Sequence, residues 1–169
     1  MGMSKANVCN WLKKPNQVWI SRTTACEIFE MDEMYHFIEC KPTSETRENI
    51  YATSLISREP GQIVSFAVAF DKSPIRLQSI IDNAPDAENY ATDGFFGYID
   101  LVYPGKHIRN ISNKNDTFTV EGINADLRHY IPILARRSRC FCRKMELLCL
   151  LMLIISLEGR NRGIRLGES

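Results

Sequence analysis

The sequence predicts an α/β domain in which a mixed sheet of five strands is flanked by helices. Apolar residues make up 44% and charged residues 24% of the 169 residues, which is ordinary globular composition for a chain of about one domain. Short runs of strand character recur along the chain. Segments with helical apolar spacing are interleaved with them, and this alternation is typical of an α/β domain.

The strands are expected where β-branched and aromatic residues cluster between turn signals. The five expected strands are 26–31, 49–57, 62–70, 89–92 and 107–111. The first is expected to end at Asp32 and Glu33. Pro60-Gly61 predicts a hairpin turn between the second and third, with Gly61 at positive φ.

The helices are expected over 4–14, 72–83, 95–102 and from 119 onward. Ser73 is expected to cap the second, and Pro74 suits its first helical position. In the last helix one face is apolar: Val120, Ile123, Leu127, Ile131 and Leu134. Pro132 is expected to kink or break this helix. Segment 4–14 has two interpretations, the recognition helix of a helix-turn-helix or any short amphipathic helix.

The cysteine pattern and the N-terminal residues predict a reduced cytoplasmic protein. The six cysteines include no Cys-x-x-Cys pair, and the first residues lack the apolar core of a signal peptide. The uncharged stretch 147–157 is too short for a membrane span, which needs about 20 residues, so a buried core helix is expected there. The net charge of +1 does not exclude nucleic acid, because a local basic patch can bind it.

Three carboxylates occupy positions where α/β sheets form sites. Asp32 is expected at the end of the first strand, Asp93 at the end of the fourth, and Glu121 in the first turn of the last helix. Such carboxylates repel one another unless a cation joins them, and Mg²⁺ prefers oxygen ligands. The arrangement is the one that a two-metal phosphoryl-transfer site requires.

Each carboxylate also has a structural interpretation. Glu121 could interact favourably with the positive end of the helix dipole, and Asp93 with Gly94 could simply form a turn. Asp32 stands beside Glu30 and Glu33 in a cluster that could be solvated surface.

Polar and basic residues on and after the last helix suggest a phosphate-binding surface. Asn124 and Arg128 share a helical strip with Glu121 at the rim of the apolar face, where they could contact a phosphate. The basic residues continue without an acidic residue through Arg136, Arg137, Arg139, Arg143 and Lys144. This stretch favours a nucleic-acid backbone, and the alternative is a solvated helix face.

Three blocks together resemble a known family. EMDEMYHFI (30–38), YATDGFFGYIDLVYPGKHI (90–108) and TVEGINADLRHYIPILARRSRCF (119–141) are similar to the catalytic core of bacterial transposases of the insertion-sequence-one family. The resemblance covers roughly residues 4–148. It implies an RNase H-like fold with a DDE triad of Asp32, Asp93 and Glu121. These residues would hold two Mg²⁺ ions, with Mn²⁺ as a substitute.

The resemblance implies cleavage of phosphodiester bonds at insertion-element ends and strand transfer into target DNA. The partners it implies are element-end and target DNA and further copies of the chain on DNA. It predicts a remnant of an N-terminal helix-turn-helix and linker at 1–20, the catalytic domain at 21–148, and an atypical tail at 149–169, as in a frameshifted gene copy.

Two other functions are compatible with the sequence. One is a catalytically inactive transposase remnant that binds DNA or an intact transposase. The other is an RNase H-like nuclease that hydrolyses RNA–DNA hybrids.

Overall fold

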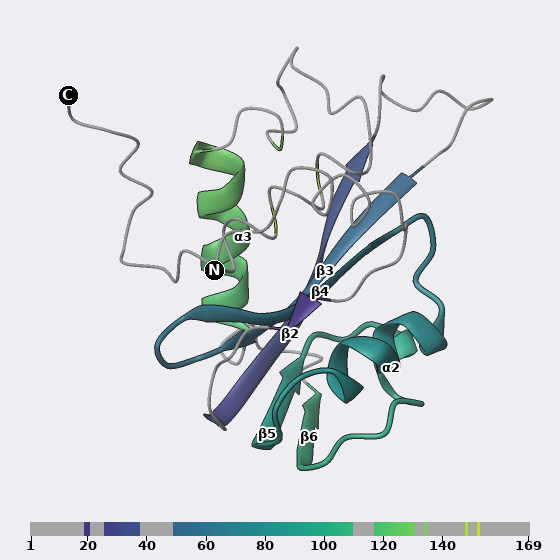
Figure 1. Ribbon diagram of the computed structural model, residues 1–169, viewed down its shortest axis with the longest axis vertical. Helices are drawn as coiled ribbons and strands as arrows, with labels where there is room; N and C mark the ends of the chain where they lie inside the picture. The colour runs from purple at the N-terminus through teal and green to yellow at the C-terminus, as the bar shows by residue number, and fades with distance from the viewer. Residues whose placement is uncertain are drawn as a thin grey trace, which may run out of the picture.

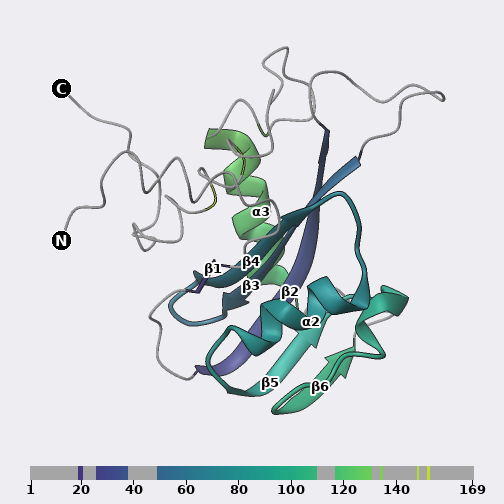
Figure 2. The ribbon, with the colours of Figure 1, turned by 45° about the vertical axis from the view of Figure 1, so that its right-hand side comes forward.

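The computed structural model describes residues 19–20, 26–37, 49–109 and 117–130, together with Leu134, Leu148 and Met152. These residues form one mixed sheet with helices α2 (Pro74–Asp82) and α3 (Phe118–Tyr130) on opposite faces (Figures 1 and 2). The predicted α/β class with a mixed sheet and flanking helices is confirmed.

The sheet has the strand order β1-β4-β3-β2-β5-β6. Its strands are β1 (Trp19–Ile20), β2 (Cys26–Phe37), β3 (Asn49–Ser57), β4 (Gln62–Ala69), β5 (Ala87–Thr92) and β6 (Lys106–Arg109). Strands β2, β3 and β4 pair antiparallel, and β5 and β6 continue parallel to β2. Five strands match the five expected ones. The two-residue β1 adds an edge strand inside the segment predicted to be a linker.

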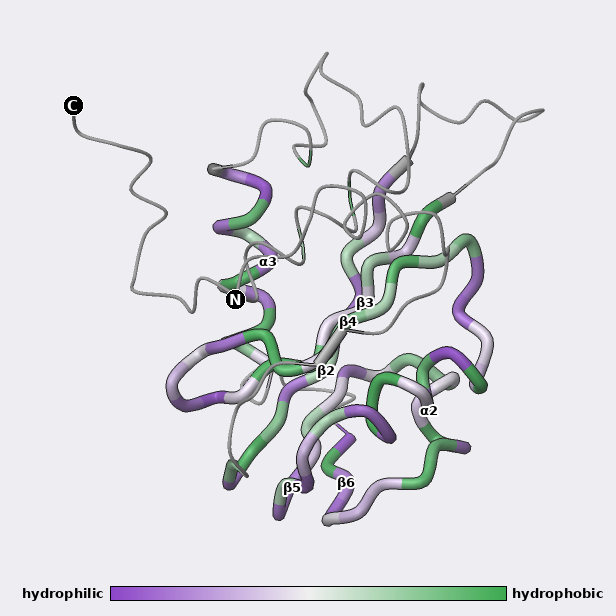
Figure 3. Tube along the Cα trace, viewed as in Figure 1, coloured by the Kyte–Doolittle hydropathy of each residue, from purple (hydrophilic) through white to green (hydrophobic). Residues whose placement is uncertain are grey.

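The β3–β4 hairpin forms where Pro60-Gly61 predicts it. Gly61 has φ 77°, and its N–H donates to the Ser57 carbonyl oxygen at 3.0 Å. A side chain is rarely tolerated at this φ, so glycine suits the position. The turn is hydrophilic (Figure 3), and β4 beyond it is almost fully buried.

Strand β2 is longer than expected, and the predicted end at Asp32 and Glu33 is wrong. Pairing with β3 continues through these residues to Phe37, with Asp32 opposite Ser54 and Glu33 opposite Thr53. Two adjacent acidic residues suggest a strand end, because a buried carboxylate is costly without partners. Here partners are present, so the strand continues and Asp32 lies in its middle.

The helices agree with the sequence in position and differ in detail. Ser73 precedes α2 and Pro74 begins it, but the Ser73 side chain makes no capping hydrogen bond. Instead, the Asp71 carboxylate accepts the Ser73 N–H at 2.9 Å. The expected helix 95–102 contains only the 3₁₀ turn η1 (Phe96–Tyr98). The expected helix 4–14 and Pro132 lie outside the described residues.

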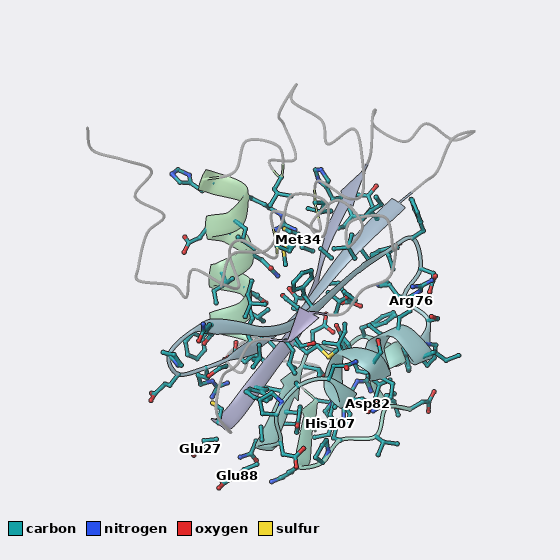
Figure 4. The ribbon with its side chains drawn as sticks, in the orientation of Figure 1. Glu27, Met34, Arg76, Asp82, Glu88 and His107 are labelled. Atoms are coloured by element: carbon teal, nitrogen blue, oxygen red, sulfur yellow. The ribbon has the colours of Figure 1, made fainter. Side chains whose placement is uncertain are left out.

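Two apolar cores lie on the two faces of the sheet. The α3 face carries Met34 (Figure 4), the predicted stripe residues Val120, Ile123, Leu127 and Leu134, and also Leu148 and Met152. Leu148 and Met152 are helical and are 0% and 1% exposed, and the other residues of the core helix expected over 147–157 lie outside the described part of the chain. The α2 face packs Leu77, Ile80 and Ile81 on β2, β3 and β4. No helix among the described residues is long and apolar enough to span a membrane.

Candidate metal centre

The parallel pairing of β2 with β5 sets the position of the acidic site. The paired residues run to Met31 opposite Thr92, where β5 ends. Asp93 follows Thr92, and Asp32 and Glu33 follow Met31, so all three reach the same level of the sheet. Within the described ranges, β2 has no strand neighbour on this side beyond Met31. Side chains from both faces of β2 can therefore turn toward Asp93.

Asp32, Glu33 and Asp93 form a cluster that can hold a metal ion. Each offers one carboxylate oxygen, these oxygens lie within 4.8 Å of one another, and all three residues are partly buried. The structure thus brings together two of the three predicted ligands, Asp32 and Asp93. It adds Glu33, which the sequence offered only as a neighbour of Asp32 in a cluster that could be solvated surface. Successive side chains along a strand point to opposite faces, so Asp32 and Glu33 are expected to point apart. This alternation argues against Glu33 as a ligand in the same site as Asp32.

Glu121 lies near this cluster but is not part of the close group. It stands in the first turn of α3, where the Thr117 hydroxyl donates to its Oε1 at 3.4 Å. Its charge is near enough to raise the pKa of Asp32. Its role as a metal ligand stays a prediction.

Asn124 orients Asp32. The Asn124 side chain is buried at 3% exposure, and its Nδ2 donates to Asp32 Oδ2 at 3.0 Å. The sequence predicted that Asn124 could contact a phosphate. In the structure its amide is engaged with a carboxylate of the cluster, and the phosphate contact stays a prediction.

Asp32 and Glu33 are held in an environment that disfavours two negative charges. Burial raises the pKa of Asp32, and the charges of Asp93 and Glu121 raise it further, against hydrogen bonds that lower it. Burial also raises the pKa of Glu33, opposed chiefly by Lys72. A divalent cation would relieve both effects, and three carboxylates are the donor set that hard cations prefer.

Glu33 has a cationic neighbour that the sequence did not reveal. Lys72 Nζ lies 3.6 Å from Glu33 Oε1 and 3.8 Å from the centre of the Phe95 ring. The Glu33 Oε1 atom is buried. The nearby Tyr98 hydroxyl, also buried, helps to lower the pKa of Glu33. Glu33 thus faces the Lys72 cation and also offers one carboxylate oxygen to the metal site beside Asp32 and Asp93.

Glu30 is fully buried, so its interpretation as solvated surface is wrong. Its Oε1 lies 2.7 Å from Arg58 Nε, and its Oε2 accepts the backbone N–H of Val120 at 2.8 Å. An acceptor at this place satisfies one of the free N–H groups of a helix start. Glu30 thus fastens the first turn of α3 to β2, which places Asn124 over Asp32.

Asp93 is tied to the loop that follows it. Its Oδ1 accepts the Phe95 N–H at 2.9 Å, which leaves its other oxygen for the cluster. Arg109 lies on β6, and its guanidinium donates a hydrogen bond to the Gly94 carbonyl oxygen. The chain therefore bends at Gly94 with support from the Asp93 side chain, and Asp93 also belongs to the acidic cluster.

Only one residue of the predicted DNA-binding set beyond Asn124 is described. Arg128 is partly exposed on α3. Burial lowers the pKa of His36, and the charge of Arg128 lowers it further. Arg136, Arg137, Arg139, Arg143 and Lys144 lie outside the described residues. Cys26 is a free thiol. The other five cysteines lie outside the described part of the chain.

The chain matches no protein-family model and no curated protein. Its fold and its site define an α/β protein with an acidic cluster that can hold a metal ion.

Proposed function

We propose that the protein is the catalytic core of a DNA transposase that cleaves phosphodiester bonds at insertion-element ends and joins the freed ends to target DNA. The observation that carries this proposal is the meeting of Asp32 and Asp93 beyond the end of a parallel strand. These are two residues of the triad implied by the resemblance to insertion-sequence-one transposases. The strand order and directions are compatible with an RNase H-like fold.

The proposed cofactor is Mg²⁺, with Mn²⁺ as a substitute. Asp32, Glu33 and Asp93 would hold it, with Glu121 on the α3 side. Bound Mg²⁺ supplies charge stabilisation at the phosphoryl oxygens and lowers the pKa of an attacking water or hydroxyl. The protein's own part is orientation: Asn124 fixes Asp32, and the Phe95 N–H fixes Asp93.

The test is cleavage of labelled DNA fragments taken from both sides of the gene. Wild-type protein is compared with Asp93→Asn in Mg²⁺, in Mn²⁺ and in chelator. Glu88→Gln is the matched control, because Glu88 is exposed at the opposite end of β5 (Figure 4). We expect metal-dependent cleavage by wild type and Glu88→Gln, and none by Asp93→Asn.

The other outcomes separate the alternative functions. If folded wild-type protein binds DNA in a salt-sensitive manner but never cleaves it, the inactive remnant replaces the transposase. If it hydrolyses RNA–DNA hybrids without preference for the flanking DNA, a nuclease replaces it.

A further inference from the structure

Phe96 is a large aromatic side chain exposed beside the acidic cluster. It is 77% exposed, although it lies only three positions after Asp93. Its neighbour Phe95 is turned inward, where its ring meets the Tyr98 ring edge-on at 5.5 Å. Burying Phe96 as well would remove apolar area from water, so its exposure leaves a favourable contact unmade.

The loop that carries Phe96 is held in place on several sides. The Phe95 N–H is bonded to Asp93, and the Ile99 N–H donates to the Phe96 carbonyl oxygen at 3.1 Å. Farther along, Gln78 of α2 makes two hydrogen bonds to the backbone of Val102, at 2.8 and 2.9 Å. The backbone that carries Phe96 is therefore held in place close to Asp93 in the chain.

Arg109 gives this aromatic ring a cationic companion. Its guanidinium carbon lies 5.0 Å from the Phe96 ring centroid, within cation–π range. The same guanidinium donates to Gly94, next to Asp93. The surface thus combines one exposed aromatic ring, one cation and a neighbouring acidic cluster that can bind metal.

This combination fits a nucleobase better than an apolar partner. Aromatic side chains stack on any base, and arginine adds cation–π and phosphate contacts. Ile99 and Val102, farther along the same segment, are also exposed, but the Arg109 cation at the Phe96 ring disfavours a purely apolar partner there. Bases in a duplex are stacked on each other, so only an unpaired base offers its face to Phe96.

We propose that Phe96, supported by Arg109, is a stacking site for one unpaired nucleobase of DNA adjacent to the phosphate at the metal centre. The inference rests on the proposed function, because it takes DNA as the substrate. Phe96 would act as a positioning residue that holds an opened strand end beside Asp93.

The test measures binding by fluorescence anisotropy in chelator, so that no cleavage occurs. Two labelled DNA probes share one sequence: a blunt duplex and the same duplex with a short unpaired 3′ tail. The variants are Phe96→Ala, Phe96→Trp and, as control, Ile75→Ala. Ile75 is 83% exposed on α2 and belongs to no part of the proposed site. Circular dichroism confirms that each variant is folded.

We expect wild type to prefer the tailed probe. Phe96→Ala should weaken binding of the tailed probe by about 5- to 150-fold, the range for losing one base–aromatic stack, and leave binding of the blunt duplex unchanged. Phe96→Trp should keep the preference, because it keeps an aromatic face. Ile75→Ala should bind both probes as wild type does.

The stacking site is refuted if wild type shows no preference for the tail, or if Phe96→Ala retains that preference. The two proposals can fail separately. Metal-dependent cleavage without a Phe96-dependent preference removes the stacking site alone. A Phe96-dependent preference in a protein that never cleaves DNA keeps the stacking site and removes the transposase activity.

Discussion

Glu30→Gln is expected to destabilise the protein strongly, although it changes one atom type and little volume. Both Glu30 oxygens face donors, Arg58 Nε at 2.7 Å and the Val120 N–H at 2.8 Å. Glutamine replaces one acceptor by an NH₂ donor. Whichever way the amide turns, one of the two donors then faces another donor.

The cost follows from the exposure of each partner. Losing a hydrogen bond to a buried charged group costs about 1.5–3 kcal/mol. The Arg58 side chain is 23% exposed and can be partly rehydrated, so its lost attraction adds only about 0.5–1 kcal/mol. We therefore expect the free energy of unfolding to fall by about 2–4 kcal/mol.

Urea unfolding followed by circular dichroism measures this change. Glu27→Gln is the matched control, because Glu27 is exposed on the same strand, and its effect should stay within about 0.5 kcal/mol. A loss under about 1 kcal/mol for Glu30→Gln would refute the role of Glu30 as the buried anchor of α3.

Three further predictions test packing and electrostatics. Gly122→Ala should stabilise α3 by up to about 1 kcal/mol, because an added Cβ meets no atom within 4 Å. Gly105→Ala should instead destabilise the protein, because its Cβ would overlap backbone oxygens of β5, and thermal unfolding of both variants measures the difference. Leu148→Ala should lower the free energy of unfolding by about 2–5 kcal/mol, and a near-neutral result would show that Leu148 does not pack in the core. Asp32→Asn should stabilise the metal-free protein at neutral pH, because the raised pKa of Asp32 in the folded state means that its ionisation opposes folding. Melting curves across pH should show that this gain in stability vanishes below pH 3.8, the ordinary pKa of an aspartate.

Patterns local to one element were predictable from the sequence. The stripe of Val120, Ile123 and Leu127 follows the helical period, and these residues are buried as expected. Gly61 adopts the positive φ that its turn requires. The meeting of Asp32 and Asp93 was also foreseen, but through an incorrect picture of Asp32 at a strand end. The site forms where β5 ends, because β2 has no described strand neighbour on that side beyond this point.

Contacts across elements could not be predicted in the same way. Lys72 reaches Glu33 only because the segment after β4 returns past the middle of β2, and no spacing in the sequence shows this. Glu30 looked exposed because its partners, Arg58 and Val120, are distant in sequence. Acidic residues close together in a sequence suggest solvent exposure unless their partners are known, which is why a solvated cluster is one interpretation of Glu30, Asp32 and Glu33.

The pairing of β2 with β5 has a consequence for the order of folding. Strands β2, β3 and β4 are consecutive along the chain, whereas β5 joins β2 only after that whole meander and α2 have been passed. Contacts between distant segments form slowly, because a long loop must close first. Asp32 and Asp93 stand on the two sides of this contact. During refolding, the ability to bind a metal ion should therefore appear later than the hairpin strands, and its rate should report closure of the β2–β5 pair.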